Sequence, residues 1–213
     1  ITIPGAFNGS LMVFIPAIGY FFITDIHYGS SLTSAQEGIL RKETALMAKM
    51  ANENDDIDFI VIGGDTTTGM YGSKEDCVKW TQTALDPFRA STKPVFVLMG
   101  NHDDNSYSTG KNASGIITDL DWQNNIIDRY TNRNGITVVQ DDPAKRENSK
   151  YFYYDLEDKK TRVIALDALD YEAKYDENGY VLTIDENEDG LIDGLPVRYA
   201  PAEKDREKYQ NGT

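Results

Sequence analysis

Short apolar runs recur along the first half of the chain, and each has the length of a single β-strand. They predict strands at residues 11–15, 20–24, 57–62 and 95–99. The run at 57–62 is nearly continuous, which is typical of a strand covered on both faces. Residues 11–23 form the most apolar stretch, but they include Pro16 and Gly19 and are too few to cross a bilayer. We therefore expect no membrane span.

Helical patterns separate these strands. Residues 35–52 carry apolar side chains mostly on one face, and Thr33 or Ser34 precedes them as a candidate N-cap. Ser73 can cap a second helix that runs toward Phe88. Alternation of strand and helix favours parallel pairing of the strands, so the pattern predicts an α/β fold.

The second half of the chain has a less regular pattern. It predicts a polar loop at 105–115, a helix at 116–130, a short strand at 136–140 and a hairpin from 151–156 and 161–166. The charged tail at 201–213 suggests a helix start or a segment that orders on assembly. Because no internal repeat or proline-rich linker interrupts the pattern, we expect one domain over residues 1–213.

Composition narrows the classes of function. The formal net charge of −14 argues against nucleic-acid binding, which needs clustered Lys and Arg to neutralise phosphates. The same charge would repel an anionic substrate unless bound cations reversed the local field. Cys77 is the single cysteine, which excludes an internal disulfide and a multi-cysteine metal site. The chain starts at Ile1 rather than Met, so we expect the native N-terminus to have been removed or to lie outside this chain.

Three short polar segments follow three of the predicted strands. They are Asp25-Ile26-His27, Gly63-Gly64-Asp65 and Gly100-Asn101-His102-Asp103, and they contain both histidines of the chain. Carboxylate, imidazole and amide groups at the ends of successive parallel strands can gather a divalent metal at one sheet edge. Because residues two apart in an extended chain point to the same side, we expect Asp25 and His27 to reach one metal together. Each segment alone has an ordinary structural alternative, namely a cap or a turn.

Taken together, the three segments resemble the calcineurin-like metallophosphoesterases, whose pattern begins D-x-H, G-D and G-N-H-[DE]. The resemblance covers residues 20–103 closely and 151–170 more loosely. It implies a sandwich of two mixed β-sheets flanked by helices. It also implies two divalent ions, Mn, Fe, Zn or Mg, and hydrolysis of a phosphate mono- or diester by a metal-bound hydroxide. The implied metal ligands are Asp25, His27, Asp65 and Asn101, with His102 as general acid.

The chain departs from the family pattern at two places. Many members have Asp or Asn three residues after the G-D aspartate, where this chain has Thr68. The group that orients His102 is then unassigned. Asp103 is a candidate for this catalytic role, and a loop cap is its alternative. The later family histidines are absent, since no histidine follows His102. We therefore expect weak binding of the second metal, and we expect the domain to be truncated at its C-terminus and to lack its last strands.

A second acidic segment resembles a calcium-binding loop. Asp185, Asn187, Asp189 and Asp193 surround Gly190 at the spacing of an EF-hand start. The twelfth position is Pro196, and residues 179–184 predict a strand where a helix should precede the loop. These departures favour an acidic hairpin tip over a calcium site.

The sequence thus predicts a metal-dependent phosphohydrolase, a phosphatase or phosphodiesterase, acting on a small phosphate ester. One alternative is a non-catalytic binding module that kept the fold and holds at most one metal. Another is a different metal-dependent hydrolase on the same scaffold, such as a nucleotidase. Missing strands would leave an open strand edge at the 151–166 hairpin, so we also expect self-association through that edge.

Overall fold

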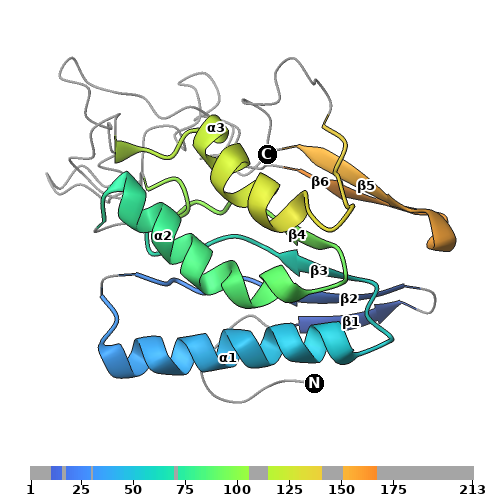
Figure 1. Cartoon of the computed structure of the whole chain (residues 1–213), viewed down its shortest axis with the longest axis horizontal. Helices are drawn as coiled ribbons and strands as arrows, with labels where there is room; N and C mark the ends of the chain where they lie inside the picture. Colours follow the sequence, from blue (N-terminus) through green and yellow to red (C-terminus); the bar gives the residue numbers. More distant parts are fainter. Residues whose placement is uncertain are drawn as a thin grey trace, which may run out of the picture.

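A computed structural model describes residues 11–15, 18–29, 31–69, 72–105, 115–140 and 151–166. Its main sheet contains, in spatial order, β1 (Leu11–Ile15), β2 (Ile18–Ile23), β3 (Phe59–Ile62) and β4 (Val95–Val97). β1 runs antiparallel to β2, whereas β2, β3 and β4 are mutually parallel. The predicted parallel α/β arrangement is therefore confirmed (Figure 1).

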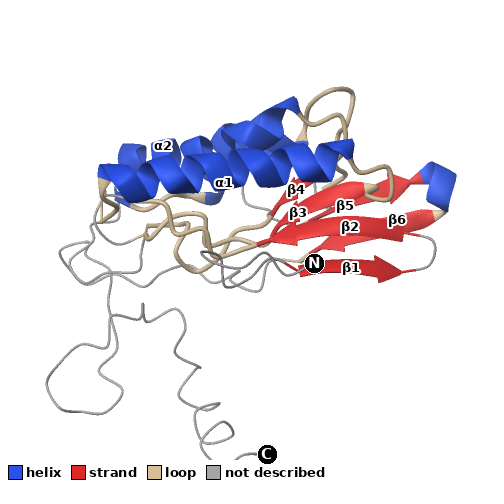
Figure 2. Ribbon diagram, turned by 90° about the horizontal axis from the view of Figure 1, so that it is seen from below, coloured by secondary structure: helices blue, strands red, loops and turns tan. Residues whose placement is uncertain are grey.

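The helices α1 (Ser34–Glu53) and α2 (Lys74–Leu85) connect the parallel strands and lie on the same face of the sheet (Figure 2). Each begins with a capping box, in which Thr33 and Ser73 are the N-caps, as predicted. A 3₁₀ turn, η1 (Asp86–Ala90), continues α2 and has Pro87 in its first turn. Ile60 and Ile62 of β3, which lies between β2 and β4, are completely buried in the hydrophobic core.

The third helix differs from its predicted form. α3 (Asp119–Trp122) continues directly as a π-helical segment, η3 (Gln123–Thr131), so the helical region starts later than the predicted residue 116. Tyr130 is buried in this segment, and its hydroxyl lies 3.0 Å from the Gln82 carbonyl and 2.8 Å from an Asp86 carboxylate oxygen. These contacts hold η3 against the end of α2.

The strand predicted at 136–140 is wrong. Within the described part of the chain, this segment contributes only an isolated bridge between Val139 and Tyr153. The backbone of Val138 donates to the side-chain oxygen of Asn132, a local turn contact that replaces a regular ladder.

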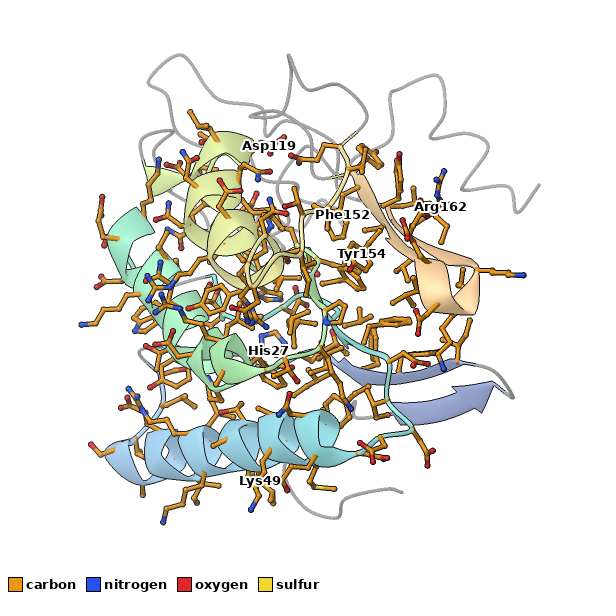
Figure 3. The ribbon with its side chains drawn as sticks, turned by 45° about the vertical axis from the view of Figure 1, so that its right-hand side comes forward. His27, Lys49, Asp119, Phe152, Tyr154 and Arg162 are labelled. Carbon is orange, nitrogen blue, oxygen red and sulfur yellow. The ribbon has the colours of Figure 1, made fainter. Side chains whose placement is uncertain are left out.

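The predicted hairpin is confirmed. β5 (Phe152–Leu156) and β6 (Thr161–Ala165) pair antiparallel around the short 3₁₀ turn η5 (Glu157–Lys159). Phe152 and Tyr154 face the main sheet, and their rings lie 6.0 and 5.6 Å from the ring of Phe96 (Figure 3). Aromatic packing therefore joins the hairpin to β4.

Several sequence-based expectations lie outside the described residues. They include the acidic segment at 185–193 and the tail at 201–213. The single domain and its C-terminal truncation stay predictions. Among the described helices, none has both the length and the hydropathy needed to cross a membrane.

Candidate metal centre

The loops that follow β2 and β3 are joined by backbone hydrogen bonds. The Asp25 amide donates to the Gly64 carbonyl at 3.1 Å, and the His27 amide donates to the Asp65 carbonyl at 3.0 Å. These bonds extend the parallel pairing of β2 and β3 beyond the last residues of the strands. The first two polar segments are thereby held side by side at the carboxyl edge of the sheet.

Two glycines allow the third loop to approach equally closely. Gly64 has φ of +96°, and a Cβ built on it would lie 2.4 Å from the Gly100 amide nitrogen. A Cβ on Gly100 would lie 2.2 Å from an Asp65 carboxylate oxygen and 2.4 Å from the Asp65 nitrogen. Because backbone atoms cannot move aside as a flexible side chain can, both positions require glycine.

Three of the candidate ligands have left-handed backbone conformations. Asp25, His27 and Asp65 have φ of 58°, 51° and 52°. The expectation that Asp25 and His27 belong to an extended chain is therefore wrong. The two side chains still approach, with His27 Nε2 3.6 Å from Asp25 Oδ1. Left-handed residues other than glycine are uncommon, and such strain is found preferentially at functional sites.

The three loops bring His27, Asp65 and His102 into one cluster. A possible ligand atom from each lies within 4.8 Å of the other two, and all three residues are partly buried. Asp25 is exposed and is not one of these three residues, although its Oδ1 lies 3.6 Å from His27 Nε2. Asn101 directly follows Gly100, so it lies at the same edge and is also partly buried. The ligand roles of Asp25, His27, Asp65 and Asn101 stay predictions.

His102 is held by both of the other loops. Its backbone amide donates to Asp65 Oδ1 at 3.0 Å, and its ring Nδ1 lies 2.6 Å from the Thr68 carbonyl oxygen. The rings of His27 and His102 meet edge to face, with centroids 4.8 Å apart. The imidazole of His102 is therefore fixed in place beside the candidate metal ligands.

Asp103 is completely buried beneath the cluster. Its Oδ1 accepts hydrogen bonds from the backbone amides of Thr66 and Thr67 at 2.8 and 3.2 Å, and from the Thr66 hydroxyl at 2.5 Å. Its Oδ2 accepts from the Gly100 amide at 2.8 Å. This position fits the loop-capping alternative for Asp103, and its catalytic role stays a prediction.

Burial changes the pKa of the Asp103 carboxyl. Desolvation raises the pKa of its carboxyl to about 6, although the hydrogen bonds from Thr66, Gly100 and Thr67 act in the opposite direction. The negative charge of Asp65 raises the pKa further. Whatever its charge, the Asp103 carboxyl joins the Asp65 loop to the His102 loop through these hydrogen bonds.

Sequence reasoning missed the backbone groups of residues 66–68, which supply two amides to Asp103 and one carbonyl to His102. Backbone donors and acceptors are present at nearly every residue, so no residue type marks them in a sequence. In the sequence, only an aspartate directly after the motif histidine, Asp103, suggested that a carboxylate anchors this loop.

The comparisons with known proteins agree with this geometry. A family model described as calcineurin-like phosphoesterase matches residues 20–193. The searches of curated proteins and of solved structures gave no match. The family match spans most of the chain and includes all three strand-end segments. The chain therefore belongs to the calcineurin-like phosphoesterase family.

Proposed function

We propose that this chain is a metal-dependent phosphohydrolase that cleaves a phosphate mono- or diester at the carboxyl edge of its main sheet. The observation that carries this proposal is the convergence of His27, Asp65 and His102 within 4.8 Å, from loops that follow three different strands. Family membership supports hydrolysis of a phosphoester.

The donor set fits a divalent ion. Imidazole and carboxylate groups suit Mn, Fe or Zn, and the carboxylate-rich side of the cluster also suits Mg. In this proposal Asp25, His27 and Asp65 would hold one ion, and Asp65 and Asn101 would contribute to a second. A bound cation would draw negative charge from the phosphoryl group and favour ionisation of the attacking water. It would also offset the net charge of −14, which otherwise repels a phosphate ester.

Hydrogen bonds within the chain hold Asp65 and His102 in fixed positions relative to each other. Asp65 receives the backbone amide of His102 at 3.0 Å, so the carboxylate and the imidazole keep a constant spacing. His102 would donate a proton to the leaving-group oxygen as the phosphorus–oxygen bond breaks. Asp103 holds both loops from below through its contacts with Thr66 and Gly100.

The second candidate function is a binding module that holds a single metal and catalyses nothing. It is favoured by the compactness of the His27, Asp65 and His102 group, which could surround one ion. The two functions differ in stoichiometry and in turnover.

Calorimetric titration with Mn²⁺, combined with hydrolysis of an aryl phosphate and a diaryl phosphate, separates these functions. We expect slow, metal-dependent hydrolysis, because the second ion binds weakly. Asp65→Asn should lower the rate at least about a hundredfold. The matched control is Asp158→Asn, in the exposed turn η5, which should leave the rate unchanged. One bound ion with no turnover of either ester would instead support the binding module.

A further inference from the structure

The ring of His102 needs a partner that decides which of its nitrogens carries the proton. Position 68, where many family members have a side-chain carboxylate or amide, is Thr68 in this chain. The structure provides a different group at this place. The main-chain carbonyl of Thr68 lies 2.6 Å from His102 Nδ1.

A carbonyl oxygen can accept a hydrogen bond but cannot donate one. At 2.6 Å the contact with His102 is favourable only if Nδ1 carries the proton. In a neutral ring the lone pair then belongs to Nε2. We propose that the Thr68 carbonyl is a positioning group that fixes the neutral His102 ring as the Nδ1–H tautomer, so that Nε2 is the basic nitrogen of the ring.

The hydroxyl of Thr68 does not provide this contact. Among the described residues, Thr68 Oγ1 is a buried side-chain atom without a hydrogen-bond partner. The residue therefore acts on His102 through its main chain, and the tautomer should be insensitive to the identity of its side chain.

The position of the carbonyl is fixed by the loop around it. The Thr68 amide donates to the Tyr28 carbonyl at 3.2 Å, and the amides of Thr66 and Thr67 donate to Asp103. On the other side, Gly69 has φ of +61°, and a Cβ built on it would lie 2.0 Å from the His102 carbonyl oxygen. The peptide that carries the carbonyl is thus held from both ends.

The arrangement has a consequence for the proposed reaction. A side-chain carboxylate beside Nδ1 would add a negative charge next to the imidazole, whereas a carbonyl orients the ring without a formal charge. The catalytic meaning of this inference rests on the proposed function. With Nδ1–H bonded to the carbonyl, the proton that His102 would give to the leaving group is the one that Nε2 carries in the imidazolium form, and the ring is left as the neutral Nδ1–H tautomer. The tautomer itself exists without metal or substrate and can be measured separately.

Nitrogen-15 NMR of metal-free protein with labelled histidine tests the proposal. The chain has only two histidines, so His102→Gln assigns both imidazole spectra. In the neutral form of the His102 ring, we expect a protonated Nδ1 and an unprotonated Nε2. A protonated Nε2, or rapid exchange between the two tautomers, would overturn the proposal.

Two variants separate the carbonyl from the hydroxyl. Thr68→Val keeps the carbonyl and removes the hydroxyl, so the tautomer should not change. Gly69→Ala displaces the peptide, because its Cβ cannot be accommodated beside the His102 carbonyl. It should mix the tautomers and lower kcat about tenfold or more, with KM little changed. A tautomer altered by Thr68→Val would assign the contact to the hydroxyl and contradict the proposal.

If Gly69→Ala fails to fold, the spectra of the wild type and of Thr68→Val still decide which tautomer His102 adopts. If His102 is the Nδ1–H tautomer but the protein hydrolyses neither phosphate ester, the proposed function is disproved and the tautomer proposal stands.

Discussion

At the scale of single residues, the site depends on backbone conformations that most residues avoid. Asp25, His27 and Asp65 are left-handed, and Gly64 and Gly100 allow a contact between loops that a Cβ would prevent. Such conformations cost free energy and persist only where surrounding contacts impose them. Here the contacts are the backbone bonds between the β2 and β3 loops and the four hydrogen bonds accepted by Asp103.

Gly100→Ala should damage the candidate metal centre. The new Cβ would lie 2.2 Å from an Asp65 carboxylate oxygen, so the loop or the carboxylate must shift. We expect at least tenfold weaker Mn²⁺ binding by calorimetry, which is about 1.4 kcal/mol. Gly38→Ala is the matched control, since a Cβ there meets nothing within 4 Å and lies in α1. The control should bind normally and be more stable by about 1 kcal/mol. Equal binding by both variants would contradict the close approach.

Asp103 should make stability depend on pH. Its pKa is raised to about 6 in the folded protein, against an ordinary value of 3.8. Between these values the folded state binds more protons than the unfolded state, so this group's contribution falls as pH rises. The slope is at most about 1.4 kcal/mol per pH unit, and the contribution is constant above the folded pKa.

Denaturant unfolding of the wild type and of Asp103→Asn, from about pH 4 to 7 in EDTA, measures this contribution. The stability difference between the two proteins should shrink by a few kcal/mol across that range. Asp103→Asn should nevertheless be less stable than the wild type at about pH 7, because an amide offers only one acceptor oxygen to the amides of Thr66 and Gly100. A pH-independent difference would show that the carboxyl is not perturbed.

At the scale of elements, polar contacts from distant residues hold the helices to the loops of the sheet. Lys93 donates from the loop before β4 to the Ala51 carbonyl at 2.9 Å and to the Asn54 carbonyl, at the end of α1. α1 has no basic residue in its own last turn, so this lysine supplies the positive charge that a helix C-terminus favours. Helix ends are thus satisfied by tertiary contacts rather than by neighbours in sequence.

Arg133 joins η3 to η1 in the same way. Its guanidinium donates to the carbonyls of Tyr130, Arg89, Ser91 and Phe88, at 2.7 to 3.1 Å. Burial lowers its pKa, and Arg89 adds a repulsive charge. Arg133→Lys keeps the charge but loses the forked donors, so it should cost about 1–3 kcal/mol in urea unfolding. Arg162→Lys, in an exposed pair with Asp155, is the control and should change stability by less than about 1 kcal/mol. Similar losses of stability in the two variants would argue against a role for the forked guanidinium donors of Arg133.

At the scale of the whole molecule, the candidate metal centre connects three loops from β2, β3 and β4. A ligand that binds only the folded arrangement stabilises the protein by mass action. The hairpin of β5 and β6 packs onto β4 through the contacts of Phe152 and Tyr154 with Phe96. Metal binding should therefore stabilise the sheet to which the hairpin is attached.

Zn²⁺ at about a hundred times its dissociation constant should raise the melting temperature by roughly 5–10 °C, and EDTA should reverse the change. His27→Gln should lose most of the shift because it removes the imidazole of a proposed metal ligand in the cluster. Asp158→Asn, remote from the cluster, should retain it. Scanning calorimetry measures both effects. A shift of the same size in His27→Gln would place the metal elsewhere.

The β6 strand is the candidate surface for self-association. Among the described residues β6 pairs only with β5, and Ile164 and Leu166 are 64% and 69% exposed. An open apolar strand can pair with a second copy. Ile164→Lys should therefore lower the average mass seen by light scattering at high concentration, whereas Ile39→Lys, on the exposed face of α1, should not. A wild-type chain that stays monomeric throughout would contradict this expectation.

The hydrophobic pattern by itself determined the strand and helix order of the first half, because local periodicity reports which face of an element is buried. Thr33 and Ser73 were identifiable as caps, since their side chains act within one turn. The strand-end motifs also located His27, Asp65 and His102 at one edge, because parallel strands carry their carboxyl ends together.

The tertiary structure alone decided how this edge is built. The left-handed Asp25 and His27, the buried Asp103 and the Thr68 carbonyl beside His102 depend on contacts between residues more than thirty positions apart. The segment at 136–140 pairs with β5 only at Val139, because the amide of the adjacent Val138 is bonded to the side chain of Asn132 instead of to a strand. Backbone carbonyls and amides look the same at every residue, so only the folded chain shows which of them serve the site.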